Sequence, residues 1–232
     1  RLYNVAAAVY RGSILGLIPK KKIPTYAEFY EGRYFTSGEE RITKFCLGEY
    51  EVPFGTNLLF CCEELPELVL GCEICEDLWV ADPPSTSHAL AGATVIANLS
   101  ASNETVSKDT YRELLVKSTS ARLLCGYIYT SAGEGESTQD LVFGGHNLIA
   151  ENGTLLAQSS RFATGILYTD LDVLKISSER RRMGTFGKQP TASYCKIPFS
   201  MELTETRLER KFAAHPFVPE DPALRNRRCE DI

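Results

Sequence analysis

The sequence predicts an α/β sandwich built from mixed β-sheets. Short apolar, β-leaning runs recur along the chain, turn sequences join some of them as hairpins, and at least two stretches suit helices. The flanking strands are apolar nearly throughout, which is typical of strands in a sheet covered on both faces. With 232 residues, 44% hydrophobic and 24% charged, the chain can bury a sizeable core. This composition excludes a disordered chain, a collagen or a coiled-coil rod, and no apolar run reaches the length of a membrane span.

Two hairpins are predicted. One joins the apolar runs 2–10 and 14–18 through the turn Arg11-Gly12-Ser13, and the other turns at Asn152-Gly153, a dipeptide that favours tight hairpins. The polar stretch 36–51 is predicted to be irregular. Strands are predicted, in order, at residues 2–10, 14–18, 58–62, 68–75, 94–99, 127–132, 146–150, 155–158 and 165–173.

Two helices are predicted, a short one at 88–92 and a longer one that begins after Ser107 and runs to about residue 125. Ser107 is a suitable capping residue, and Asp109 is favourable in the first turn. Positions at three- and four-residue steps share one face of the longer helix, which we expect to pack inward. This face consists of Tyr111, Leu114, Leu115, Ser118, Ala121 and Cys125.

The charge is unevenly distributed along the chain. The overall net charge is −5, so the molecule as a whole is not an electrostatic binder of nucleic acid. Residues 175–232 nevertheless carry a net charge of +4, contain five prolines and have few aliphatic runs. We therefore predict a compact domain over residues 1–174, followed by a helix and an extended linker over residues 175–232.

Cys75 is the sharpest candidate for chemistry. It ends the apolar strand 68–75 and is followed by Glu76-Asp77-Leu78-Trp79, so its thiol lies where a strand passes into a helix. Backbone N–H groups at such a turn favour a thiolate and can form part of an oxyanion hole. The simpler alternative is a buried packing thiol. Cys72-x-x-Cys75 is also half of a zinc motif, but no second pair at suitable spacing accompanies it, so we predict no metal site. Eight cysteines without a visible signal peptide favour reduced thiols and a cytoplasmic location.

Three consecutive lysines, Lys20, Lys21 and Lys22, occupy the loop that follows the first predicted hairpin. A solvated basic loop is the simpler interpretation. An ammonium held beside a thiolate would instead favour ionisation of the thiol and could stabilise an oxyanion. The two interpretations differ in whether this loop lies next to Cys75.

Several ordered motifs carry a resemblance that extends over nearly the whole chain. They are Pro-Lys-x-x-Ile-Pro-x-Tyr-x-Glu-Phe-Tyr-Glu at 19–31, Cys-Glu-Asp-Leu-Trp at 75–79, Ala-Asn-Leu-Ser-Ala-Ser at 97–102, the Gly/Glu/Ser run at 133–140, Ile-Ala-Glu-Asn-Gly at 149–153 and His-Pro-Phe-Val-Pro at 215–219. Together they resemble the nitrilase superfamily, and more narrowly the glutaminase domains of glutamine-dependent NAD⁺ synthetases. The resemblance implies a four-layer α-β-β-α sandwich, here lacking its first strands, and a Cys-Lys-Glu site that hydrolyses the amide of L-glutamine.

The resemblance also implies a role for individual residues. Cys75 matches the nucleophile and Lys20 the lysine of the triad, whereas Glu28 matches a second glutamate that positions the lysine and the substrate. The backbone N–H of Glu76 would bind the oxyanion. Contacts with glutamine are implied for Tyr26, Ser102 and Lys108, and Trp79 would form a wall of the pocket.

One part of the pattern is missing from this sequence. In the family the general-base glutamate lies well upstream of the lysine, and Glu28, Glu31 and Glu73 stand in other motif contexts. We expect either that residues before Arg1 supply it or that this fragment is inactive. The synthetase half is also absent, so ATP and Mg²⁺ are expected only there and no cofactor is expected in this domain. The implied partners are that synthetase domain and a second copy of the chain, with no nucleic acid and no membrane.

Two other functions remain open from the residues. A different nitrilase-family amidase or carbamoyl hydrolase would use the same nucleophile on another small amide. A catalytically inactive fragment could instead act only as an assembly module. The run at 133–140 and the tail motif favour the glutaminase, and the missing glutamate favours the inactive module.

Overall fold

The structure is a computed structural model that describes residues 1–232 except 139, 188–190, 213–217, 220 and 232. Part of the motif at 215–219 and one residue of the run at 133–140 therefore lie outside the described residues. The strands are β1 (Val5–Tyr10), β2 (Ser13–Pro19), β3 (Thr43–Leu47), β4 (Tyr50–Phe54), β5 (Leu58–Cys62), β6 (Val69–Ile74), β7 (Val95–Ser100), β8 (Gly126–Ser131), β9 (Leu148–Glu151), β10 (Thr154–Gln158) and β11 (Cys195–Phe199). The α-helices are α1 (Pro84–Leu90), α2 (Lys108–Leu123), α3 (Val173–Arg182) and α4 (Pro222–Glu230), and short 3-10 helices occupy Glu31–Arg33, Cys75–Leu78, Glu134–Glu136 and Thr191–Ser193.

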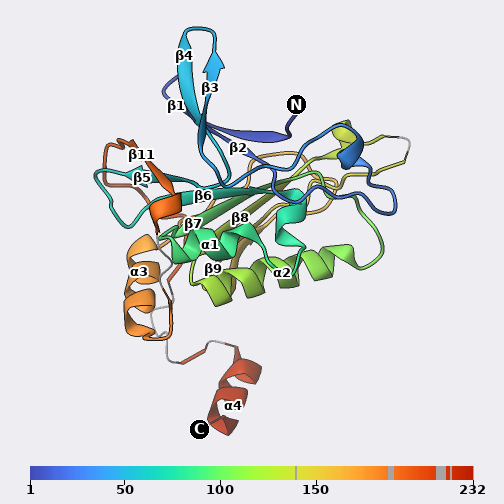
Figure 1. Ribbon diagram of the computed structural model, residues 1–232. Helices are drawn as coiled ribbons and strands as arrows, with labels where there is room; N and C mark the ends of the chain where they lie inside the picture. The colour runs from blue at the N-terminus through green and yellow to red at the C-terminus, as the bar shows by residue number, and fades with distance from the viewer. Residues whose placement is uncertain (139, 188–190, 213–217, 220, 232) are drawn as a thin grey trace.

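The strands form two stacked sheets. The smaller sheet has the order β1-β2-β4-β3, and the larger has the order β10-β9-β8-β7-β6-β5-β11. In the larger sheet β6, β7 and β8 are parallel to one another, whereas β5 and β9 run antiparallel to their neighbours β6 and β8. Figure 1 shows the smaller sheet above the larger one and the helices below it. The prediction of mixed sheets in an α/β sandwich is confirmed.

Apolar side chains fill the space between the two sheets. Ala6 and Ile18 of the smaller sheet pack with Leu58, Phe60 and other residues of the larger sheet. Gly16 lets the sheets approach closely, because a Cβ atom there would lie 2.9 Å from a methyl group of Leu58. The first predicted hairpin thus forms one wall of this interface.

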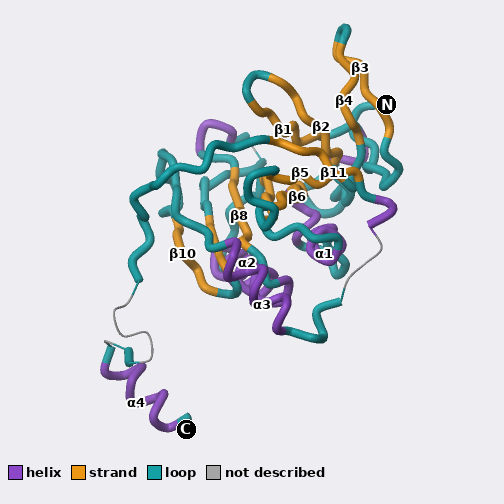
Figure 2. The backbone as a smooth tube through the Cα atoms, turned by 90° about the vertical axis from the view of Figure 1, so that its left-hand side faces the viewer, coloured by secondary structure: helices purple, strands orange, loops and turns teal. Residues whose placement is uncertain are grey.

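Helices cover the side of the larger sheet that faces away from the smaller sheet. A second core, which includes Ile96, Val116 and Tyr127, lies between this sheet and helices α1 and α2. Figure 2, turned by 90°, also places α1, α2 and α3 on that side. Within the described residues, no helix lies over the outer face of the smaller sheet in either view.

Two segments differ from the sequence-based expectation. The stretch 36–51, predicted to be irregular, contains β3 and the start of β4, which turn at Gly48 with φ of +61°. This left-handed conformation is readily adopted by glycine and closes the hairpin. Conversely, 165–173 forms no strand, and Ile166 and Tyr168 are exposed although apolar residues there had suggested burial.

Helix α2 occupies nearly the predicted range but buries a different face. Tyr111 and Leu114 are exposed, whereas Arg112 and Val116 are completely buried. Arg112 can be buried because its guanidinium lies 2.9 Å from the Glu104 carboxylate. A charged residue on the inward face hides the apolar periodicity on which the prediction rested.

The segment after residue 174 contributes to the domain, contrary to the linker expected there. Ile176 of α3 is fully buried, and β11 pairs in parallel with β5 at the edge of the larger sheet. Cys195, Ile197 and Phe199 alternate toward the core between the sheets, so β11 has a strand pattern that Pro198 obscured. Helix α4 stands apart from the sandwich, at the end of the chain (Figure 1).

Candidate active site

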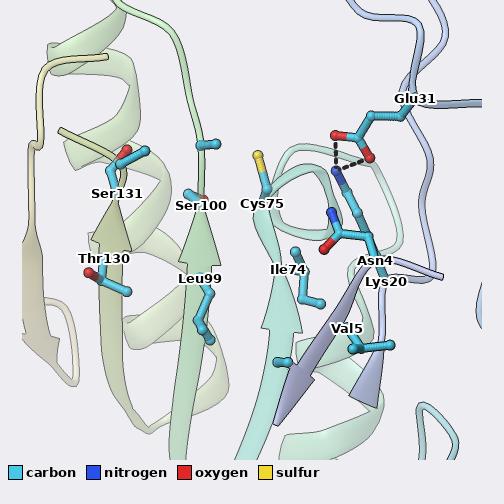
Figure 3. A pocket seen from close by; sticks show the side chains of 13 residues that line it. Asn4, Val5, Lys20, Glu31, Ile74, Cys75, Leu99, Ser100, Thr130 and Ser131 are labelled. Carbon is cyan, nitrogen blue, oxygen red and sulfur yellow. Dashed lines mark hydrogen bonds and ion pairs between the residues drawn. The ribbon is translucent and has the colours of Figure 1, made fainter. Parts of the chain in front are cut away.

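The candidate site lies where three parallel strands end. β6 leads into Cys75, β7 into residues 100–102 and β8 into residues 131–132, and the three strands are neighbours in the larger sheet. Ligands of open α/β sheets bind outside the carboxyl ends of such strands. Lys20, directly after β2, approaches the same edge from the smaller sheet (Figure 3).

The turn at Cys75 holds the thiol in an unusual backbone conformation. Cys75 has φ of +48°, a left-handed value that is uncommon for residues other than glycine. The 3-10 helix Cys75–Leu78 starts at once, and the first N–H groups of such a helix have no acceptor within it. The backbone N–H of Glu76 belongs to this first turn and is suited to binding an oxyanion near the sulfur.

Lys20 is buried beside this turn and is paired with Glu31. Its side chain is 1% exposed, and its Nζ lies 2.7 Å from Oε1 and 2.8 Å from Oε2 of Glu31. Figure 3 shows the ammonium and the Cys75 sulfur on opposite sides of the same opening. Of the two interpretations of the lysine loop, the structure therefore agrees with a lysine placed at the thiol.

A cavity of about 400 Å³ connects these groups. Its volume is sufficient for a small amide substrate. It is lined by Asn4, Val5, Ala6, Lys20, Glu31, Ile74, Cys75, Leu99, Ser100, Ala101, Thr130, Ser131 and Ala132.

Glu28 does not contact Lys20. Its Oε1 accepts a hydrogen bond of 2.6 Å from Nδ2 of Asn103, and the Asn103 Oδ1 accepts one from Lys108. The lysine partner is instead Glu31, at the end of the same motif. The 3-10 helix that starts at Glu31 turns the loop back and brings this carboxylate to the ammonium.

The other residues implied by the resemblance form a second group around the thiol. Tyr26 donates a hydrogen bond of 2.8 Å to Oε1 of Glu76, and Lys108 lies 5.3 Å from the centre of the Trp79 ring. Ser102 is buried at the end of the strand that carries the 97–102 motif. None of these four residues lines the 400 Å³ cavity.

Burial changes the pKa of several groups near the thiol. It raises the pKa of Tyr26 to about 12, with help from the hydrogen bond to Glu76 and from the charge of Cys75. It lowers the pKa of Lys108, although the charges of Cys75 and Glu28 act in the opposite direction. Burial also raises the pKa of Tyr129, and Cys75 again contributes. Tyr26, Lys108 and Tyr129 thus all lie within electrostatic range of Cys75.

Two buried carboxylates lie directly behind the nucleophile turn. Glu73 accepts hydrogen bonds from the Tyr127 hydroxyl and, at 2.8 Å, from the Ser85 N–H. Asp77 accepts from the N–H groups of Lys22, at 2.7 Å, and Ile74, at 2.9 Å. Sequence patterns alone did not assign a role to either residue, because their partners come from distant segments or from the backbone.

Within the described residues, no group of three or more His, Cys, Asp or Glu side chains is arranged to hold a metal ion. None of the helices in this part of the chain has the length and hydropathy needed to cross a membrane.

Comparison with known proteins identifies the family. The carbon-nitrogen hydrolase family matches residues 2–181, which is most of the chain. The chain belongs to this family. The nitrilase-like sandwich, with Cys75 at the end of β6, is thus the fold of a carbon-nitrogen hydrolase.

The relatives of this carbon-nitrogen hydrolase support the narrower resemblance found in its motifs. It is 45% identical to the glutamine-dependent NAD(+) synthetase of Mycobacterium tuberculosis over 99% of this chain and 35% of that protein. It is 32% identical to the enzyme of the same name from Aquifex aeolicus, over 81% of this chain and 30% of that protein. The chain therefore spans about a third of the length of the curated relatives that it matches.

Solved structures agree with this assignment. A glutamine-dependent NAD(+) synthetase from Cytophaga hutchinsonii matches with a TM-score of 0.61 and 29% identity, over 72% of this chain and 26% of that chain. Saccharomyces cerevisiae Nit3, of branch 10 of the nitrilase superfamily, matches with a TM-score of 0.57 over 79% of this chain and 58% of its own. At 20% identity the second similarity shows the fold alone.

Proposed function

We propose that this domain hydrolyses the side-chain amide of L-glutamine, with Cys75 as the nucleophile. The observation that carries the proposal is the convergence of Cys75 and the buried Lys20 on one cavity at the carboxyl ends of parallel strands. The chain's similarity to glutamine-dependent NAD(+) synthetases supports glutamine as the substrate. Other nitrilase-type amidases share the cavity chemistry, so the choice among amides rests on these relatives.

The chemistry follows from the positions of the groups. The Cys75 thiolate attacks the amide carbonyl carbon, and the negative charge on the carbonyl oxygen is stabilised by Lys20 and the Glu76 N–H. Collapse of this intermediate breaks the C–N bond, releases ammonia and leaves a glutamyl thioester. Water then hydrolyses the thioester to glutamate and restores the thiol. Glu31 holds Lys20 in place throughout, because both carboxylate oxygens contact its Nζ.

Proton transfer to the departing ammonia needs an acid. The resemblance assigns this step to a glutamate upstream of the lysine, and Glu31 does not occupy that position in the motif. In the intact protein the ammonia would serve the ATP-dependent amidation of deamido-NAD⁺ in the synthetase domain. Homo-oligomerisation, a cytoplasmic location and the use of ATP and Mg²⁺ in that domain stay predictions.

Ammonia release from glutamine tests the proposal. We expect the unsubstituted protein to hydrolyse glutamine, Cys75→Ala to be inactive, and the matched control Cys46→Ala, at an exposed cysteine, to retain activity. A series of other small amides separates glutaminase from a general amidase. Glutamine hydrolysis that persists in Cys75→Ala would exclude Cys75 as the nucleophile.

A further inference from the structure

A single buried side chain bonds both catalytic segments. Asp77 is 2% exposed, and each of its two carboxylate oxygens accepts one backbone hydrogen bond. Oδ1 accepts from the N–H of Lys22, which lies just after Lys20, and Oδ2 accepts from the N–H of Ile74, directly before Cys75. The segments that carry the ammonium and the thiol therefore meet on one carboxylate.

The other bonds of the lysine segment lead elsewhere. The Lys20 N–H donates to the Asn4 carbonyl at 2.8 Å, and the Lys20 carbonyl accepts from Gly38 at 2.8 Å. Asn4 precedes β1 and Gly38 lies between β2 and β3, so both partners belong to segments that flank strands of the smaller sheet. These bonds therefore attach the lysine to the smaller sheet. The hydrogen bond from Tyr26 to Glu76 also reaches the nucleophile turn, but it is exposed to solvent. Asp77 provides a buried connection between the lysine loop and the turn that carries Cys75.

A carboxylate suits this position for two reasons. It has only acceptors, so both oxygens can face N–H donors, whereas an amide would turn an NH₂ group toward one of them. It also bonds the N–H that precedes Cys75, whose left-handed backbone needs support from its surroundings. Burial raises the pKa of Asp77, and the hydrogen bonds from backbone N–H groups counteract this rise.

We propose that Asp77 is a positioning residue that fixes the Lys20 ammonium relative to the Cys75 thiol. The inference takes the roles of Lys20 and Cys75 from the proposed function, whereas the hydrogen bonds of Asp77 do not depend on it. Loss of the carboxylate would let the lysine loop move away from the turn, and the thiol would then lose the influence of the ammonium. Asp77 would thus affect Cys75 through Lys20 and not by direct contact with substrate.

A double-mutant cycle on the reactivity of Cys75 tests this coupling. Iodoacetamide alkylation at neutral pH is followed by mass spectrometry of the Cys75 peptide in the unsubstituted protein, Lys20→Met, Asp77→Asn and the double variant. Lys20→Met removes the positive charge that faces the same cavity as the sulfur and should slow alkylation by about tenfold. Asp77→Asn should slow it by a similar factor, and the double variant should be no slower than Lys20→Met, within about twofold.

Glu73 offers a matched control. It is equally buried and equally close to Cys75 in sequence, but its hydrogen bonds go to Tyr127, Ser85 and Asn98 and none goes to the lysine loop. The fold-changes in alkylation rate caused by Glu73→Gln and by Lys20→Met should therefore multiply in the variant that carries both substitutions. An unchanged alkylation rate in Asp77→Asn or in Lys20→Met would disprove the coupling. So would a double variant whose rate is reduced by the product of the two single fold-changes.

A second measurement uses the unsubstituted protein alone, so it does not require that any variant folds. Hydrogen exchange in the unsubstituted protein should show slow exchange of both the Lys22 and the Ile74 amides, because both donate to the buried carboxylate. Rapid exchange at Lys22 would overturn the proposal. Alkylation and exchange need no glutamine turnover, so failure of the glutaminase assay and failure of this inference are distinguishable.

Discussion

Glu31 binds the Lys20 ammonium through both of its carboxylate oxygens, at 2.7 and 2.8 Å from Nζ. The lysine is almost completely buried, and its partner carboxylate is partly exposed to the cavity. A buried charge of this kind requires a partner, because an unpaired ammonium would be strongly disfavoured away from water. The pair therefore compensates the buried ammonium and fixes the direction of the lysine side chain in the cavity.

Replacing Glu31 by Gln should impair catalysis more than replacing Glu28. Glu31→Gln leaves Lys20 without a counter-charge, and a lysine displaced from its position should reduce glutamine hydrolysis by about tenfold to a hundredfold. Glu28→Gln keeps an oxygen that can accept from Asn103, so its loss should be smaller. Steady-state ammonia release measures both variants. A larger loss in Glu28→Gln would show that Glu28 supports the lysine during the reaction.

Lys108 should act on substrate binding. Its half-buried ammonium lies against Trp79 and donates to Asn103, where it can bind the α-carboxylate of glutamine. A charge-assisted hydrogen bond contributes about 1.5–3 kcal/mol, so Lys108→Met should raise KM by about tenfold or more with a smaller change in kcat.

Two comparisons distinguish this binding role from a loss of stability. Lys117→Met removes a partly exposed lysine of the same helix that pairs with Glu113, and should leave KM unchanged. An amide substrate without the α-carboxylate should be hydrolysed equally well by Lys108→Met and the unsubstituted protein. If Lys108→Met discriminates against that substrate too, the α-carboxylate assignment is wrong.

Glu73 should make the folding stability depend on pH. Burial raises its pKa from 4.5 to about 7, although the hydrogen bond from Tyr127 opposes this change. A raised carboxyl pKa means that the folded state holds a proton more tightly than the unfolded state. The stabilising contribution is therefore full below about pH 4.5 and is lost as the pH rises through about 7.

Urea unfolding of Glu73→Gln across this range provides the measurement. The unfolding free energy of the unsubstituted protein should fall by about 1–3 kcal/mol relative to Glu73→Gln between these pH values. Glu63→Gln, at an exposed glutamate, should show no such divergence. Parallel pH curves for the unsubstituted protein and Glu73→Gln would contradict the raised pKa.

Arg180 should stabilise the fold by joining the ends of two helices. Its guanidinium donates to the carbonyl groups of Ala93, at 2.7 Å, Leu123 and Leu124, both at 2.9 Å, and Ala89, at 3.4 Å. Arg180→Met leaves these carbonyls without this donor, and we expect a loss of about 2–4 kcal/mol of unfolding free energy. Arg181→Met, at the exposed neighbour, should change it by less than about 0.5 kcal/mol. Equal effects in urea unfolding would show that Arg180 lies on a solvated face.

Several elements were predictable because their signals are local. The hairpin β1–β2 and the hairpin β9–β10 follow from apolar runs around short turns, and Cys75 follows from a thiol placed at the end of an apolar strand. β3, β11 and the buried face of α2 were not predicted. β11 depends on pairing with β5, more than 130 residues earlier in the chain. β3 pairs with the neighbouring β4, but its residues are exposed and show no apolar alternation. The buried face of α2 includes Arg112, whose burial depends on its ion pair with Glu104.

The sequence by itself indicated the family, the candidate nucleophile and the lysine loop, because these depend on residue types at short, ordered spacings. Only the tertiary structure decided which glutamate contacts Lys20, that Asp77 joins the segments of Lys20 and Cys75, and that Arg180 is half-buried against four backbone carbonyls. Each of these outcomes depends on a charged group whose burial must be compensated by a partner that the fold brings to it. The identity of that partner is a property of the packed sheets and loops, which spacing within one motif does not specify.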